Sequence, residues 1–203
     1  MVDVREKLAQ LNPSSVRYDV LPSGAGSTEN PYAMALGFVP AGMGRDLLEY
    51  LYWTDGAVRR GAAIYQGIAK VAMGEWAERM RRHADAGCNY GLAESLAKFN
   101  GDRSEATTRQ RSILQARVAV ARDNLWPEKL QDKLPILIPI LLHTMKRDKE
   151  VDTNEKRAKL LGMTEASYRQ TWAPVYEWML SRMIDEEQAA ARAMEQALRN
   201  EAA

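Results

Sequence analysis

Two side chains near the C-terminus, Arg169 and Gln170, are of the types that recognise guanine and adenine edges in the DNA major groove. The residues before them follow a definite spacing. Ala158 is small enough for two helices to touch, Gly162 tolerates the positive φ of a tight turn, and Thr164 fits an N-cap. This order is typical of a helix-turn-helix. The segment therefore predicts a hairpin of two helices that presents Arg169 and Gln170 to DNA.

The second helix of this hairpin should have one face in the core and one toward DNA. Tyr168 and either Thr171 or Trp172 are expected to face inward, and Met163 should plug the core. The outward positions are Glu165, Ala166, Arg169 and Gln170. Lysines on the first helix would hold phosphates. The predicted DNA-binding residues are Lys156, Lys159, Thr164, Glu165, Ser167, Arg169 and Gln170.

Two residues depart from the usual pattern of such a unit. Arg157 lies where an aliphatic side chain is normally buried, and Pro174 either ends the second helix at 165–173 or kinks it into 175–183. Trp172 and Trp178 are interpreted as core anchors rather than stacking platforms for bases. An ordinary helical hairpin with a glycine C-cap is the alternative interpretation of the whole segment.

Catalytic and metal-binding chemistry finds no support elsewhere in the chain. One cysteine and two histidines exclude an internal disulfide and the common structural zinc sites. His83, Asp85 and Cys88 lie close in sequence, but no activating partner is visible, and Cys88 is expected to be buried or incidental. Phosphate-binding glycine loops and the common hydrolase motifs are missing. We therefore expect no enzyme activity, no catalytic residues, no metal ligands and no cofactor.

The charge of the chain is nearly balanced overall but uneven along its length. The net charge is +1, whereas residues 185–201 carry five acidic and two basic side chains, so that residues 1–184 have a net charge of +4. Short basic clusters recur at Arg79, Arg81 and Arg82, at Arg109, Arg111, Arg117 and Arg122, at Lys146, Arg147 and Lys149, and at Lys156, Arg157 and Lys159. Solvated helix faces explain each cluster singly, while their recurrence leaves nucleic-acid binding open.

The elements that must position these residues are all helical. Apolar side chains recur at spacings of three and four through most of the chain, and no alternating strand pattern is visible. The predicted fold is an all-α, multi-helix globular protein with a C-terminal helix-turn-helix and an irregular N-terminal arm. The expected ranges are 1–44 for a flexible or extended arm, 45–146 for a helical body, and 147–203 for the DNA-binding region with its acidic C-terminal helix.

Glycine and proline residues are expected to interrupt or end several of the predicted helices. The glycines of 87–91 should break a long helix, and a short helix with Leu92, Leu96 and Phe99 should follow. Pro135 and Pro139 interrupt the most apolar stretch, which predicts a kinked helix or two short ones. No apolar run is long enough to span a membrane, and the start lacks a signal peptide. The chain is therefore expected to be soluble, in the cytoplasm of a bacterial host cell, with no membrane partner.

Three stretches together resemble the lambda-type bacteriophage antitermination protein Q family. The first is the N-terminal order KLAQLNPS, a Ser/Gly-rich spacer, and YAMALGFVPAGMG from Tyr32. The second is MTEASYRQTWAPVYEW from Met163, which resembles the DNA-binding hairpin of that family. The third is the ending, with Glu186-Glu187 before a run of Ala and Arg. The family usually has a Cys-rich zinc module before the hairpin, and this chain, with Cys88 alone, would be a variant without it. Helices over 104–145 would then supply the scaffold.

The resemblance implies a function in transcription. Such proteins bind DNA at a phage late promoter, load onto host RNA polymerase with its sigma factor, and suppress pausing and termination. Nascent RNA and self-association on DNA are further candidate interactions. We expect the RNA- or polymerase-facing surface at Arg109, Arg111, Arg117, Arg122, Lys146, Arg147 and Lys149, on the ground of charge alone. Residues 13–44 could dock on polymerase.

Two other interpretations stay open. One is a simple helix-turn-helix regulator or phage DNA-packaging recognition subunit, which would bind DNA without polymerase. The other is a purely helical adaptor with no role on DNA.

Overall fold

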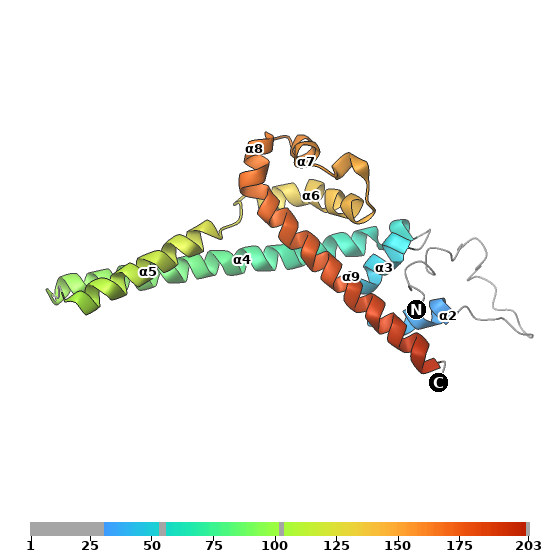
Figure 1. Ribbon diagram of the computed structural model, residues 1–203, viewed down its shortest axis with the longest axis horizontal. Coiled ribbons are helices and arrows are strands. Elements are labelled where there is room, and N and C mark those ends of the chain that lie inside the picture. The colour runs from blue at the N-terminus through green and yellow to red at the C-terminus, as the bar shows by residue number, and fades with distance from the viewer. Residues whose placement is uncertain (1–30, 53–55, 102–103, 202–203) are drawn as a thin grey trace, which may run out of the picture. The chain divides into compact units, whose positions relative to one another are not determined.

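The computed structural model describes residues 31–52, 56–101 and 104–201, and within these ranges every regular element is helical (Figure 1). This confirms the all-α prediction. The elements, in chain order, are α2 (Pro31–Phe38), α3 (Met43–Tyr52), α4 (Gly56–Phe99), α5 (Glu105–Asp123), α6 (Leu130–Met145), the 3-10 turn η2 (Lys149–Val151), α7 (Asn154–Leu160), α8 (Glu165–Ser167), the π-helical turn η3 (Tyr168–Trp172) and α9 (Ala173–Glu201). No described helix is both long and apolar enough to cross a bilayer.

Packing divides the chain into two compact units. Unit 1 combines residues 1–69 with residues 134–203, and unit 2 consists of residues 70–133. The long helix α4 contributes to both. Each of the expected ranges 1–44, 45–146 and 147–203 is one continuous stretch of sequence. Unit 1, in contrast, joins two separate stretches because they pack together, so the units and the expected ranges do not correspond. The candidate DNA-binding hairpin lies wholly in unit 1.

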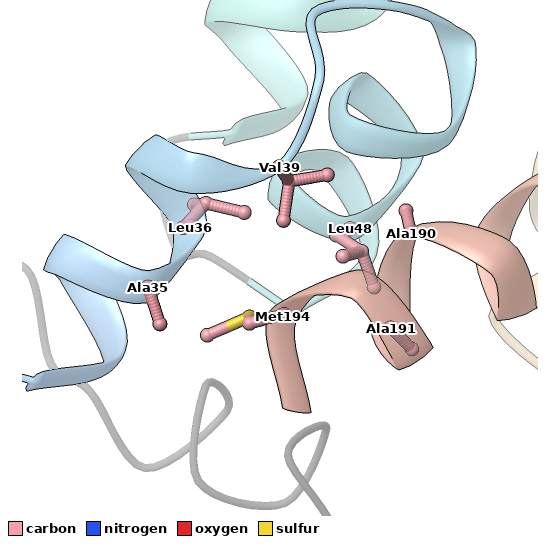
Figure 2. Close-up of a cluster of buried hydrophobic side chains, with 7 residues drawn as sticks. All are labelled: Ala35, Leu36, Val39, Leu48, Ala190, Ala191 and Met194. Carbon is pink, nitrogen blue, oxygen red and sulfur yellow. The ribbon is translucent and has the colours of Figure 1, made fainter. Parts of the chain in front are cut away.

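The helices α2, α3 and α9 meet in an apolar cluster in unit 1 (Figure 2). Its buried side chains are Ala35, Leu36, Val39, Leu48, Ala190, Ala191 and Met194. Gly44 permits a close approach between α3 and α9, because a Cβ atom there would lie 2.4 Å from the carbonyl oxygen of Glu186. The small side chains of Ala190 and Ala191 on α9 serve the same purpose. Close packing of α3 thus holds the C-terminal half of the long helix α9.

The expectation that residues 1–44 form an irregular arm is wrong for Pro31–Phe38, which form the helix α2. Its mean hydropathy is high and its side chains show almost no helical periodicity, so the sequence gives little amphipathic signal. Pro31 starts the helix, where its missing N–H leaves no bond unmade. Ala35 and Leu36 are buried against α9, which lies about 150 residues away in sequence. Contact with a distant helix therefore stabilises α2. Residues 1–30, which the sequence predicts as part of this arm, lie outside the described residues.

The helix α6 provides the second apolar surface of unit 1. It is one helix that contains both Pro135 and Pro139, not two short helices. Leu137, Ile138 and Leu141 are fully buried. The hydroxyl of Tyr176 on α9 donates a hydrogen bond to Thr144 Oγ1 at 2.5 Å, which ties α9 to the end of α6.

Unit 2 contains an antiparallel hairpin made by the C-terminal part of α4 and by α5. Trp76 Nε1 on α4 donates to the carbonyl of Pro127 at 3.2 Å, and Arg79 donates to the carbonyl of Asn124 at 2.9 Å. The Arg79 guanidinium also lies 4.7 Å above the Trp126 ring. Ser104 caps α5 by accepting a hydrogen bond from the N–H of Thr107.

The helix α4 continues through the glycines of 87–91, so the predicted break there is wrong. A glycine inside a helix costs about 1 kcal/mol relative to alanine, which a long helix can absorb. Arg81 pairs with Glu78 and Asp85 one turn to each side, just before these glycines. Hydrogen bonds from Arg81 and Arg82 lower the pKa of Glu78 to about 2. The helix ends instead at Asn100 and Gly101, where Gly101 takes a positive φ of 62°.

Candidate nucleic-acid interface

The helix α7 has well-defined ends that fix the geometry of the turn after it. The hydroxyl of Thr153 accepts a hydrogen bond from the N–H of Lys156 at 3.3 Å. At the other end, the N–H of Gly162 donates to Lys159 O and the N–H of Met163 donates to Ala158 O. These two bonds are those of a Schellman motif, which requires a left-handed residue at its centre. Gly162 has a φ of 70°, as its sequence position predicts.

The helix α8 starts directly after this turn. Thr164 is its N-cap, and its hydroxyl accepts a hydrogen bond from the N–H of Ser167 at 3.3 Å. Ala158 in α7 and Leu161 directly after it are each 1% exposed, and Tyr168, the first residue of η3, is fully buried. Met163 is only half-buried, so it covers the core rather than plugging it. The hairpin is thus closed by caps at its ends and by a small apolar core.

Helical structure continues beyond α8 through the π-helical turn η3 into α9. The N–H of Ala173 donates to the carbonyl of Tyr168, five residues earlier. Pro174 cannot donate to the carbonyl of Gln170, and its ring would press on that carbonyl in a regular α-helix. The wider π turn relieves this conflict. Pro174 therefore does not end the second helix at Ala173, and the predicted recognition segment is the N-terminal part of a helix that reaches Glu201.

All seven predicted DNA-binding residues lie on the outer side of this hairpin. The exposed residues are Lys156, Lys159, Thr164, Ser167, Arg169 and Gln170, and Glu165 is half-exposed. The two inward positions are Tyr168 and Trp172, while Thr171 is exposed. The structure thus brings one apolar face into the core and leaves the predicted polar face to solvent. Trp178, the other expected core anchor, is half-buried.

Three of these residues take part in ion pairs on the surface. Arg169 contacts Glu165 at 2.5 Å, and Lys156 Nζ contacts Asp152 at 2.8 Å. The Lys156 hydrogen bond lowers the pKa of the Asp152 carboxyl below its ordinary value. Exposed ion pairs of this kind contribute about 0–1 kcal/mol, so phosphate or a base can replace the carboxylate as a partner. The sequence pattern identified Lys156, Glu165 and Arg169 as candidate DNA-binding residues but predicted neither of these two ion pairs.

Arg157, the main departure from the expected pattern, has a structural role. Its guanidinium donates to the carbonyls of Val151 at 2.7 Å and Asp152 at 3.2 Å, and it lies 4.3 Å above the Tyr176 ring. The methylene groups of the side chain take the place of the usual aliphatic residue. The guanidinium binds the backbone of the residues that directly precede α7. Burial raises the pKa of Tyr168 to about 12, and the nearby Arg157 opposes that rise.

Replacing Arg157 with methionine is expected to destabilise the protein by about 2 kcal/mol, because the stem is kept and the charge-assisted hydrogen bonds are lost. Urea unfolding followed by circular dichroism measures this change. Lys159→Met removes an exposed cation from the same helix and should stay within about 0.5 kcal/mol of the parent. Equal stability of the two variants would contradict the role assigned to Arg157.

The residues expected to face RNA or polymerase form two separate groups. Arg109, Arg117 and Arg122 are exposed on α5 in unit 2, whereas Arg111 is half-buried. Lys146 and Arg147 follow α6 in unit 1, and Lys149 starts η2. Lys146 Nζ lies 4.0 Å above the ring of Tyr50, and Arg147 has a positive φ of 59°. The two groups belong to different compact units, and the property that they share is their positive charge.

Other candidate chemistry stays unsupported in the described part of the chain. Cys88 is exposed rather than buried. No group of three or more His, Cys, Asp or Glu side chains among the described residues could hold a metal ion. Comparisons with protein-family models, curated proteins and solved structures find no match for this chain. The interpretation of the hairpin therefore depends on its own residues and geometry.

Proposed function

We propose that the protein binds double-stranded DNA through the outer face of α7, α8 and η3. The observation that carries this proposal is that the hairpin has one apolar, buried face and one polar, exposed face. Ala158, Leu161 and Tyr168 close the hairpin from inside, while Arg169 and Gln170 project from the outside. Arg and Gln at the start of a helix can reach base edges in the major groove. Lys156 and Lys159 on the preceding helix are available to phosphates.

A selection experiment tests this proposal without knowledge of the natural site. The full-length protein is used to enrich duplexes from a random pool, and fluorescence anisotropy then measures affinity for the selected duplex and for a scrambled one. Specific proteins bind their own site about 10³–10⁷ times more tightly than other DNA. We expect a preference of at least the lower end of this range. Equal affinity for both duplexes would reject a sequence-reading role.

We further propose that this DNA binding serves transcription antitermination on bacterial RNA polymerase. Support comes from the resemblance of three ordered stretches to the lambda-type family and from the low net charge of +1. A factor retained by polymerase needs less bulk attraction to phosphate than a protein that holds DNA alone. The Cys-rich module of that family is missing from this chain, so α5 and α6 would have to supply its scaffold.

The polymerase proposal is tested by transcription in vitro. The template carries the selected duplex upstream of an intrinsic terminator, and the matched template carries the scrambled duplex. We expect read-through only on the first template, together with co-purification of the protein and RNA polymerase holoenzyme. DNA binding without polymerase association would instead favour a simple regulator or a DNA-packaging subunit. Read-through on both templates would contradict loading through the DNA element.

A further inference from the structure

A groove runs between the last turns of α4 and the first half of α5, wholly within unit 2. Its volume is about 410 Å³. Leu92 and Leu96 line it from α4, and Arg111, Leu114 and Arg117 line it from α5. The three α5 residues lie at successive spacings of three, so one continuous face of that helix forms one wall. Figure 1 shows the two helices side by side along this length.

The groove carries apolar surface that the hairpin itself does not cover. Leu92 is 62% exposed and Leu96 is 52% exposed, although they lie one turn apart on the same wall. The helix α5 has no buried residue along its length. Isolated exposed leucines are common on protein surfaces, but two leucines one turn apart in a groove offer the kind of apolar surface on which a helix face can pack.

The charged side chains of the groove are basic, and one of their hydrogen-bond donors has no acceptor. Arg111 Nε is buried and has no hydrogen-bond partner among the described residues. Arg117 adds a second guanidinium, and none of the residues that line the groove is acidic. A buried donor without an acceptor costs free energy, and more so when it is charged. A ligand that brings a carboxylate to the Arg111 guanidinium would form charge-assisted hydrogen bonds with it, and would satisfy Nε once the side chain turns toward the groove.

We propose that this groove binds an acidic amphipathic helix of a partner protein. Two apolar side chains of that helix, one turn apart, would pack on Leu92 and Leu96, and a carboxylate beside them would pair with Arg111. A second copy of this chain fits poorly, because pairing two α5 helices would place their arginines against one another. RNA would satisfy the arginines but would leave the leucines without apolar contacts. This inference concerns a surface separate from the DNA-binding hairpin and does not depend on it.

The test uses the full-length protein and two designed helical peptides. Both peptides are alanine-based with two leucines one turn apart, and they differ in having glutamates or lysines around the leucines. Cys88, the only cysteine in the sequence, is exposed and precedes the groove residue Asn89, so it can carry an environment-sensitive fluorophore. We expect saturable binding of the glutamate peptide that is at least tenfold tighter than binding of the lysine peptide.

Matched variants of the protein locate the site. Arg111→Gln and Leu92→Ala should each weaken binding of the glutamate peptide by at least tenfold. Arg109→Gln and Ile113→Ala alter the same helix outside the groove and should leave it unchanged. Melting curves identify any variant that fails to fold, and Leu96→Ala then replaces it. DNA affinity should stay at the parental value in all of them, which separates this proposal from the proposed function.

Several results would overturn the proposal. They are failure of the glutamate peptide to bind, equal binding of both peptides, or equal effects of Arg111→Gln and Arg109→Gln. Binding of a twelve-nucleotide single-stranded RNA that is lost in Arg111→Gln, without peptide binding, would assign the groove to RNA. Dimerisation in light scattering that Leu92→Ala abolishes would assign it to a second copy.

Discussion

Replacing Arg169 and Gln170 with alanine together is expected to lower affinity for the selected duplex by about thirtyfold to about twenty-thousandfold. Each side chain that reads a base contributes about 1–3 kcal/mol, and 1.4 kcal/mol is a factor of ten in affinity. Affinity for the scrambled duplex should change much less, because Lys156 and Lys159 keep their phosphate contacts. Fluorescence anisotropy of both duplexes at one fixed salt concentration measures the two effects.

The chain offers a close control for this double variant. Gln188 and Arg192 are also an exposed glutamine and an exposed arginine, and they lie on α9, the helix that continues from η3. Arg192 Nε donates to the carbonyl of Gln188 at 3.3 Å. Gln188→Ala with Arg192→Ala removes the same two side-chain types and should leave affinity for the selected duplex unchanged. Equal losses in the two double variants would contradict base reading by η3.

Replacing Gly44 with alanine is expected to destabilise unit 1 by about 3 kcal/mol. The added Cβ would lie 2.4 Å from the carbonyl oxygen of Glu186 and 3.0 Å from the Cβ of Ala190. The first of these atoms is backbone, so no side-chain rotation relieves the contact, and α3 must move away from α9. Overpacking of a close-packed interface typically costs 1–3 kcal/mol. Denaturant unfolding followed by circular dichroism measures the change in the free energy of unfolding.

Gly74→Ala is the matched control for that substitution. Gly74 lies inside α4, and an added Cβ meets nothing within 4 Å. Alanine in a helix interior is more stable than glycine by roughly 0.5–1 kcal/mol, so this variant should be slightly more stable than the parent. A neutral or stabilising effect of Gly44→Ala would contradict the close packing of α3 against α9 at this position.

The hairpin could be predicted because its signals are local. Gly162 and Thr164 act within their own turn, through a positive φ and through a single side-chain hydrogen bond. Such preferences are set by neighbouring atoms and survive in any fold. Ala158 was assigned correctly for the same reason, since the spacing to Gly162 decides which face it occupies. These residues fix the hairpin on which the exposed cations Lys156, Lys159 and Arg169 lie.

The parts that escaped prediction depend on distant contacts or on competition between neighbours. The helix α2 forms because Leu36 is buried against α9, and nothing near Pro31 in sequence signals that contact. The glycines of 87–91 favour a break locally, yet α4 continues past them beside α5. The π turn before Pro174 reflects a conflict that could equally have ended the helix. The groove at Leu92 is lined by residues of both α4 and α5, so neither segment alone signals it.

Tethered DNA cleavage tests the central claim, DNA contact by the start of this helix, most directly. Ala166→Cys, in a Cys88→Ser background, places a cleaving reagent on the exposed face of α8, and Arg192→Cys places it roughly 39 Å further along the same helix at 1.5 Å per residue. On the selected duplex we predict strand cleavage within the bound site from position 166 and none there from position 192. Cleavage from position 192 alone, or equal cleavage from both positions, would contradict the claim.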